Sequence, residues 1–108
     1  MAKKVLGQVN PSATTLTTLY TVPSAKEAVV SSISVANLTA ATATFRLAVR
    51  PAGATIENKH YIGYDITVGA SDSTIITVGL TLATTDVLSV YASTSTVAFQ
   101  AFGDEASV

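Results

Sequence analysis

Cysteine is absent from the 108-residue chain, and so is tryptophan. Without cysteine the chain forms no disulfide and offers no thiolate to a metal ion. His60 is the only histidine, and no serine lies in a G-x-S-x-G elbow, so a hydrolytic triad lacks its usual components. The seven acidic residues are scattered rather than clustered at metal-ligand spacing. The sequence therefore predicts no cofactor, no metal site and no enzymatic activity.

Charge is also scarce, since charged residues make up 12% of the chain and about 25% of a typical soluble domain. Six basic residues face seven acidic ones, so no basic field exists to attract nucleic acid or an anionic membrane. No apolar run reaches the length of a membrane-spanning helix, and none follows Lys3 and Lys4 as a secretory signal would require. We expect synthesis in a cytoplasm and a surface that repels its own copies only weakly.

What the chain has in abundance is threonine, valine, serine and alanine, arranged in short alternating runs. Threonine, valine, isoleucine and the aromatic residues favour strands. Ala43–Arg50 is the clearest case, with Phe45 and Leu47 expected inward and both arginines outward. Ser24–Val30 could instead begin a helix, although the β-branched residues after it favour a strand. The expected strands are Val5–Val9, Leu16–Val22, Ala28–Asn37, Ala43–Arg50, His60–Val68, Ser73–Leu80, Asp86–Ala92 and Thr96–Phe102.

Turn-forming residues separate these strands at a spacing of about 8–12 residues, which is typical of sandwiches and jelly rolls. Asp72 and Asp86 fit turn-capping roles through their short carboxylates. The expected fold is all-β: a single-domain, antiparallel, jelly-roll-like β-sandwich of seven to eight strands. We expect residues 1–9 to form an N-terminal arm and residues 10–108 to form the sandwich domain. In Ala28–Asn37 we expect Val29, Ile33 and Val35 to share one face.

The segment Phe45–Asp65 gathers the rare residue types of the chain: both arginines, the histidine and two of the four tyrosines. Glu57 and Asp65 could act as paired carboxylates, but ion pairing with Lys59, Arg46 or Arg50 explains them better. We interpret the segment as a protein–protein contact, because arginine pairs well with a partner's carboxylates. The candidate contact residues are Arg46, Arg50, Glu57, Lys59, His60 and Tyr61. The N-terminal arm is a second candidate, since a free arm can add a strand to a neighbour's sheet.

Three segments of the sequence carry a more specific resemblance: "PSATTLTTLYTVP", "FRLAVRPAGA" and "HYIGYD". Together with their surroundings, from about Leu6 to Glu105, they resemble a family of small virion proteins of tailed bacteriophages. Members are labelled structural, decoration or cement proteins, and related modules occur on tails and fibres. The resemblance implies a structural role without catalytic residues.

The resemblance leads to a capsid decoration or cement protein as the main functional hypothesis. Such a protein is expected to be a homo-oligomer, most often a trimer in jelly-roll members. It would bind the major capsid protein over the seams of the head and thereby stabilise the virion. The alternative hypothesis places the same fold in the tail, baseplate or fibre, as a structural or receptor-binding module. A small hydrolase dependent on His60 is the third.

Overall fold

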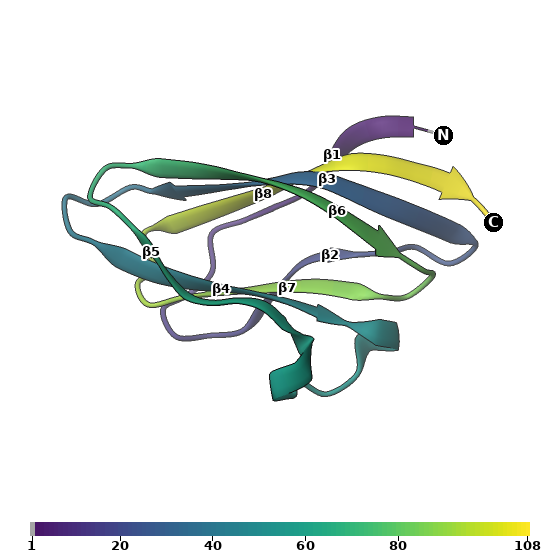
Figure 1. The fold of residues 1–108 in the computed structure, drawn as a ribbon, viewed down its shortest axis with the longest axis horizontal. Helices are drawn as coiled ribbons and strands as arrows, with labels where there is room; N and C mark the ends of the chain where they lie inside the picture. The colour runs from purple at the N-terminus through teal and green to yellow at the C-terminus, as the bar shows by residue number, and fades with distance from the viewer. Residues whose placement is uncertain (1) are drawn as a thin grey trace.

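Eight antiparallel strands form two facing sheets in the computed structural model, which describes residues 2–108. Figure 1 shows the sheets as two layers, with the segment after β4 projecting from one end of the lower layer. Two short 3₁₀ turns, Pro51–Gly53 and Asn58–His60, lie in that segment. The strands are β1 (Ala2–Val9), β2 (Thr17–Thr21), β3 (Lys26–Asn37), β4 (Ala43–Arg50), β5 (Tyr61–Val68), β6 (Ser73–Leu82), β7 (Val87–Ala92) and β8 (Val97–Ser107).

The strand order is that of a jelly roll. One sheet, sheet A, has the order β1-β8-β3-β6, and the other, sheet B, has the order β2-β7-β4-β5. The pairs β4–β5, β3–β6, β2–β7 and β1–β8 are therefore nested, as if one long hairpin had been rolled up. The predicted all-β, jelly-roll-like sandwich is confirmed, with eight strands. Lys26–Asn37 is a strand, so the helical alternative for this region is wrong.

The hydrophobic core lies between the inner faces of the two sheets. Phe45 of β4 and Phe99 of β8 meet across it, edge to face, with ring centroids 6.0 Å apart. Both rings are fully buried, as are Ile33 and Leu88 from the neighbouring strands. In β4, Phe45 and Leu47 point inward as predicted, and the arginines point away from the core. All eight strands contribute buried or partly buried side chains to this core.

Two expectations about the strands of sheet A differ from the structure. The register of β3 shifts between Val30 and Ser32 against both of its neighbours. This bulge turns Val30 rather than Val29 into the core together with Ile33, and it leaves Val29 exposed. The segment expected to be an N-terminal arm is β1, which pairs with β8 along its length and forms an edge of the sheet. These residues are therefore a strand of the chain's own sheet and not a free arm.

Gly103 in β8 lies close against the backbone of β3. A Cβ atom at this position would lie 1.9 Å from the carbonyl oxygen of Val29. We expect Gly103→Ala to lower the free energy of unfolding by about 2 kcal/mol or more, because the backbone of β3 must move to relieve the overlap. Urea unfolding followed by circular dichroism measures the change.

Gly69→Ala is the matched control, since its added Cβ would meet only ordinary contacts, the nearest at 3.6 Å from Asp72. Its unfolding midpoint should stay close to that of the wild type. Equal losses in the two variants would show that close packing around Gly103 is not the cause.

Candidate functional site

The outer surface of sheet B carries a cluster of aromatic rings around one arginine. The guanidinium of Arg46 lies between two tyrosine rings, 4.1 Å from the centroid of Tyr64 and 4.2 Å from that of Tyr91. Tyr61 packs edge-on against Tyr64 with centroids 5.0 Å apart. Stacking of this kind suits the planar guanidinium and holds it in one orientation. We call Arg46, Tyr61, Tyr64, Asp65 and Tyr91 the arginine–tyrosine cluster.

Asp65 completes the cluster by forming an ion pair with Arg46. Nε of Arg46 lies 2.7 Å from Oδ1 of Asp65, and the hydrogen bond it donates raises the pKa of Arg46 further above its ordinary range. Asp65 adopts a positive φ of 50°, a conformation that aspartate tolerates better than most residues. The register of β4 and β5 shifts at this point, between Phe45 and Leu47. The resulting bulge directs Tyr64 and Asp65 towards Arg46.

Arg50 has a different task, which is to hold the loop after β4. Its Nε donates a hydrogen bond to the buried hydroxyl of Ser89, and its Nη1 donates to the carbonyl oxygens of Gly53 and Ala54. Asp86 fixes the same loop from the other side by accepting from the backbone N–H of Ala52. Arg50 is therefore occupied within its own chain. The other oxygen of Asp86 accepts a hydrogen bond from the backbone N–H of Ala83 in the turn before β7, which confirms the predicted turn-capping role of Asp86.

The residues of the second 3₁₀ turn also separate into internal and external ones. His60 is 6% exposed, and its Nδ1 accepts a hydrogen bond from the backbone N–H of Glu57 at 2.9 Å. The ring therefore fixes the turn from inside, and little of it is exposed on the surface of the chain. Glu57 and Lys59 are exposed, and Tyr61 is half-buried. Of the six predicted contact residues, only Arg46 and Tyr61 belong to the arginine–tyrosine cluster.

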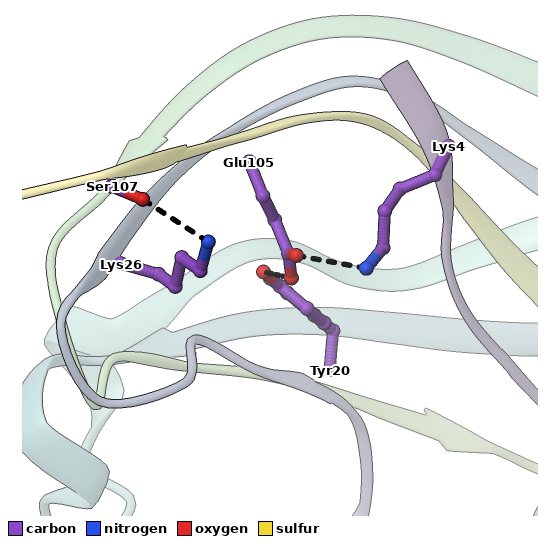
Figure 2. Close-up of polar contacts among 5 residues, drawn as sticks. All are labelled: Lys4, Tyr20, Lys26, Glu105 and Ser107. Carbon is purple, nitrogen blue, oxygen red and sulfur yellow. Dashed lines mark hydrogen bonds and ion pairs between the residues drawn. The ribbon is translucent and has the colours of Figure 1, made fainter. Parts of the chain in front are cut away.

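A second polar cluster lies at one end of the sandwich, between the sheets. Figure 2 shows Lys4 of β1 and Tyr20 of β2 converging on Glu105 of β8. Lys4 donates to Oε1 of Glu105 at 2.8 Å, and the Tyr20 hydroxyl donates to Oε2. These two hydrogen bonds lower the pKa of Glu105, while burial and the neighbouring carboxylate raise the pKa of Tyr20. Glu105 is 8% exposed, and both of its oxygens are engaged.

The two clusters hold both ion pairs found within residues 2–108. In each cluster a basic side chain forms an ion pair with an acidic one. Such pairing fits a structural role better than a role in proton transfer. Within the same residues no three histidine or acidic side chains lie close enough to hold a metal ion. No helix in this part of the chain is long and apolar enough to cross a membrane.

Sequence reasoning missed two members of the arginine–tyrosine cluster as contact residues, Tyr64 and Tyr91. Tyr91 lies on β7 and is the cross-strand neighbour of Arg46. Its distance along the chain conceals this relation, which depends on the jelly-roll order. Tyr64 is only eighteen residues from Arg46, but strict alternation in β5 places it on the same face as the buried Val68. The bulge at Asp65, which turns Tyr64 outward, could not be predicted from that pattern. The predicted pairing of Asp65 with an arginine is confirmed.

The lowered pKa of Glu105 predicts how stability depends on pH. In the folded chain the pKa of Glu105 lies below its ordinary value of 4.5. The ionised carboxylate therefore stabilises the fold at pH values above 4.5. This stabilisation is lost as the pH falls through the lower, folded value. We expect Glu105→Gln to reduce stability at pH 7 and to flatten the loss of stability below about pH 4.5. Urea midpoints measured from pH 7 to pH 2 test this.

The matched control is Glu27→Gln, because Glu27 is an exposed glutamate that forms no ion pair within residues 2–108. This variant should keep the slope of the wild type in the acid range. If Glu105→Gln keeps that slope as well, the buried carboxylate is not the group that links stability to pH.

Comparison with known proteins identifies no relative of the chain. No family model matches the chain, and no curated protein or solved structure matches it either. The functional assignment therefore depends on the residues of the chain, the geometry of its surface and the resemblance in its sequence.

Proposed function

We propose that the chain is a non-enzymatic structural protein of a tailed-phage virion, a capsid decoration or cement protein that binds the major capsid protein as a homo-oligomer. The observation that carries the proposal is the arginine–tyrosine cluster, a prearranged protein-binding surface on a fold whose other charged groups are few. The resemblance of "FRLAVRPAGA" and "HYIGYD" to phage virion proteins supplies the biological setting, and these segments contain Arg46, Tyr61 and Tyr64.

The composition of the cluster suits contact with another protein. Tyrosine and arginine are the residue types most enriched among side chains that dominate binding energy. Tyr64 is 57% exposed, so most of its ring remains available for burial. Arg46 is held by its two rings and by Asp65, so little side-chain freedom is lost when a partner covers it. Glu57 and Lys59 are exposed and belong to the turn that leads directly into Tyr61, and polar residues of this kind are typical of an interface rim.

The jelly-roll core suits a protein that must survive outside a cell. Its stability comes from buried aliphatic and aromatic side chains, and without cysteine it does not depend on redox conditions. A weakly charged surface allows neighbouring subunits to pack without strong repulsion. Bound copies would stabilise the head by burying apolar area at the seams, at about 25 cal/mol per Å² before the losses of association.

Copy number in purified virions tests the assignment. We expect quantitative mass spectrometry to find the chain at a number comparable with that of the major capsid protein. A small fixed number would place it in the tail, baseplate or fibre instead. Its absence from virions would contradict a structural role altogether.

The contact surface is tested separately by adding purified protein to virions that lack it. Tyr64→Ala should weaken binding about tenfold or more, because truncation of a central aromatic side chain removes buried area and packing. Val29→Ala is the matched control, since Val29 is an exposed apolar residue on the other sheet. Equal occupancy for Tyr64→Ala and the wild type would exclude the arginine–tyrosine cluster as the contact.

A further inference from the structure

The four edge strands of the sandwich differ in how well they are protected against pairing with another strand. β1 carries Lys3 and Lys4 and a register shift between Val5 and Gly7. β5 is interrupted by Asp65 at positive φ. β2 has five residues and is closely followed by Pro23. Lysine, bulges, proline and short length are the usual protections of a sheet edge.

The fourth edge, β6, has none of the protecting residues. Its ten residues, "STIITVGLTL", include no charge and no proline. Between Leu80 and Thr77, β6 has one residue more than the facing segment of β3, which makes a small bulge at Val78 and Gly79. The side chains of β6 nevertheless alternate between the two faces along its whole length. The odd-numbered residues from Ser73 to Thr81 are exposed and the even-numbered ones are at least half-buried. Figure 1 shows β6 along the border of the upper layer, where one row of its backbone N–H and C=O groups has no sheet partner.

Two features of the exposed face of β6 are complementary. Ile75 projects a large apolar side chain that is 70% exposed. Gly79, four residues further along the same face, has open space where a side chain would be, with no atom within 4 Å of a Cβ built there. One position thus offers an unburied apolar group, and the other offers room for one.

We infer that β6 pairs in antiparallel fashion with β6 of a second copy of this chain, around a two-fold axis at Thr77. A two-fold axis perpendicular to the sheet keeps each side chain on its own face, so odd-numbered residues can only oppose odd-numbered ones. Centring the axis on Thr77 pairs Ser73 with Thr81 and uses almost the whole strand. The same register places Ile75 opposite Gly79 of the second copy, and joins the two A sheets into one.

Symmetry also explains why the occupant is a second copy. At a two-fold axis every residue near the centre meets its own counterpart, so any charged residue there would face a like charge. β6 is free of charge throughout, and the two threonines at the axis form a favourable cross-strand pair. The contact gives an oligomer with an even number of subunits. It does not depend on the proposed location of the protein in the virion. It differs from the trimer that the resemblance implies.

Because the chain has no cysteine, a single introduced thiol tests both the contact and its register. In Thr77→Cys the two thiols would face each other across the axis, where opposed Cα atoms lie about 4.5–5.5 Å apart, within disulfide range. Mild oxidation of the full-length variant should give a covalent dimer on a non-reducing gel.

Ile75→Cys is the matched control on the same face of the same strand. Its two thiols would lie about 13 Å apart, four residues along the paired strands, which is too far for a disulfide. Mixing Ile75→Cys with Gly79→Cys should restore cross-linking between the two variants. Equal cross-linking of Thr77→Cys and Ile75→Cys alone would overturn the register.

Sedimentation analysis of the unmodified protein tests the contact without a thiol. The wild type should show an even-numbered oligomer, and Thr77→Lys, with two ammonium groups beside the axis, should raise its dissociation constant about tenfold or more. Circular dichroism shows whether this exposed substitution leaves the fold intact, and Val5→Lys on β1 is the control. A monomer or an isolated trimer in the wild type would overturn the inference, while virion binding through the arginine–tyrosine cluster could still hold.

Discussion

The structure depends on the packing of two apolar inner faces against each other, with Phe45 of β4 and Phe99 of β8 in edge-to-face contact between the sheets. The two phenylalanines are 54 residues apart in the sequence, and neither sheet could bury its inner face alone. The nested order of strands follows from this requirement, since it lets every strand contribute to one core. Polar side chains are consequently displaced to the outer surfaces and the ends of the sandwich, where any contact with other molecules must be made.

The two charged clusters show how differently polar groups are used at these places. At the end of the sandwich, Glu105 lies between the sheets, and Lys4 and Tyr20 satisfy both of its oxygens. Loss of either partner would leave a buried acceptor unpaired, so this cluster ties β1 and β2 to β8. On the outer surface of sheet B, Arg46 is fixed by two tyrosine rings and by Asp65, and its side chain is still 20% exposed beside the exposed Tyr64. Only the second arrangement leaves area for a partner to bury.

Much of this fold could be predicted from local patterns, and most of what could not depends on register. Alternation and turn residues located all eight strands, because side-chain period and backbone turns are local properties. The bulge in β3 that exposes Val29 leaves no clear mark in the sequence, and neither does the pairing that brings Tyr91 beside Arg46. His60 attracted attention as a rare residue, yet its ring closes a local turn. A residue type that is rare in the sequence often has a specific role, but its burial in the structure shows whether that role is in folding or in binding.

The scarcity of charge connects these observations. A monomeric sandwich usually protects its edges with lysine, proline or bulges, and three edges of this one are protected in such ways. The fourth, β6, presents Ile75 and an open Gly79 with no charge along ten residues. For a protein that acts alone such an edge would promote aggregation, whereas a closed two-fold contact satisfies the edge and ends there. The two proposals thus use different surfaces of the chain, an edge of sheet A for its own copy and the outer surface of sheet B for a different protein.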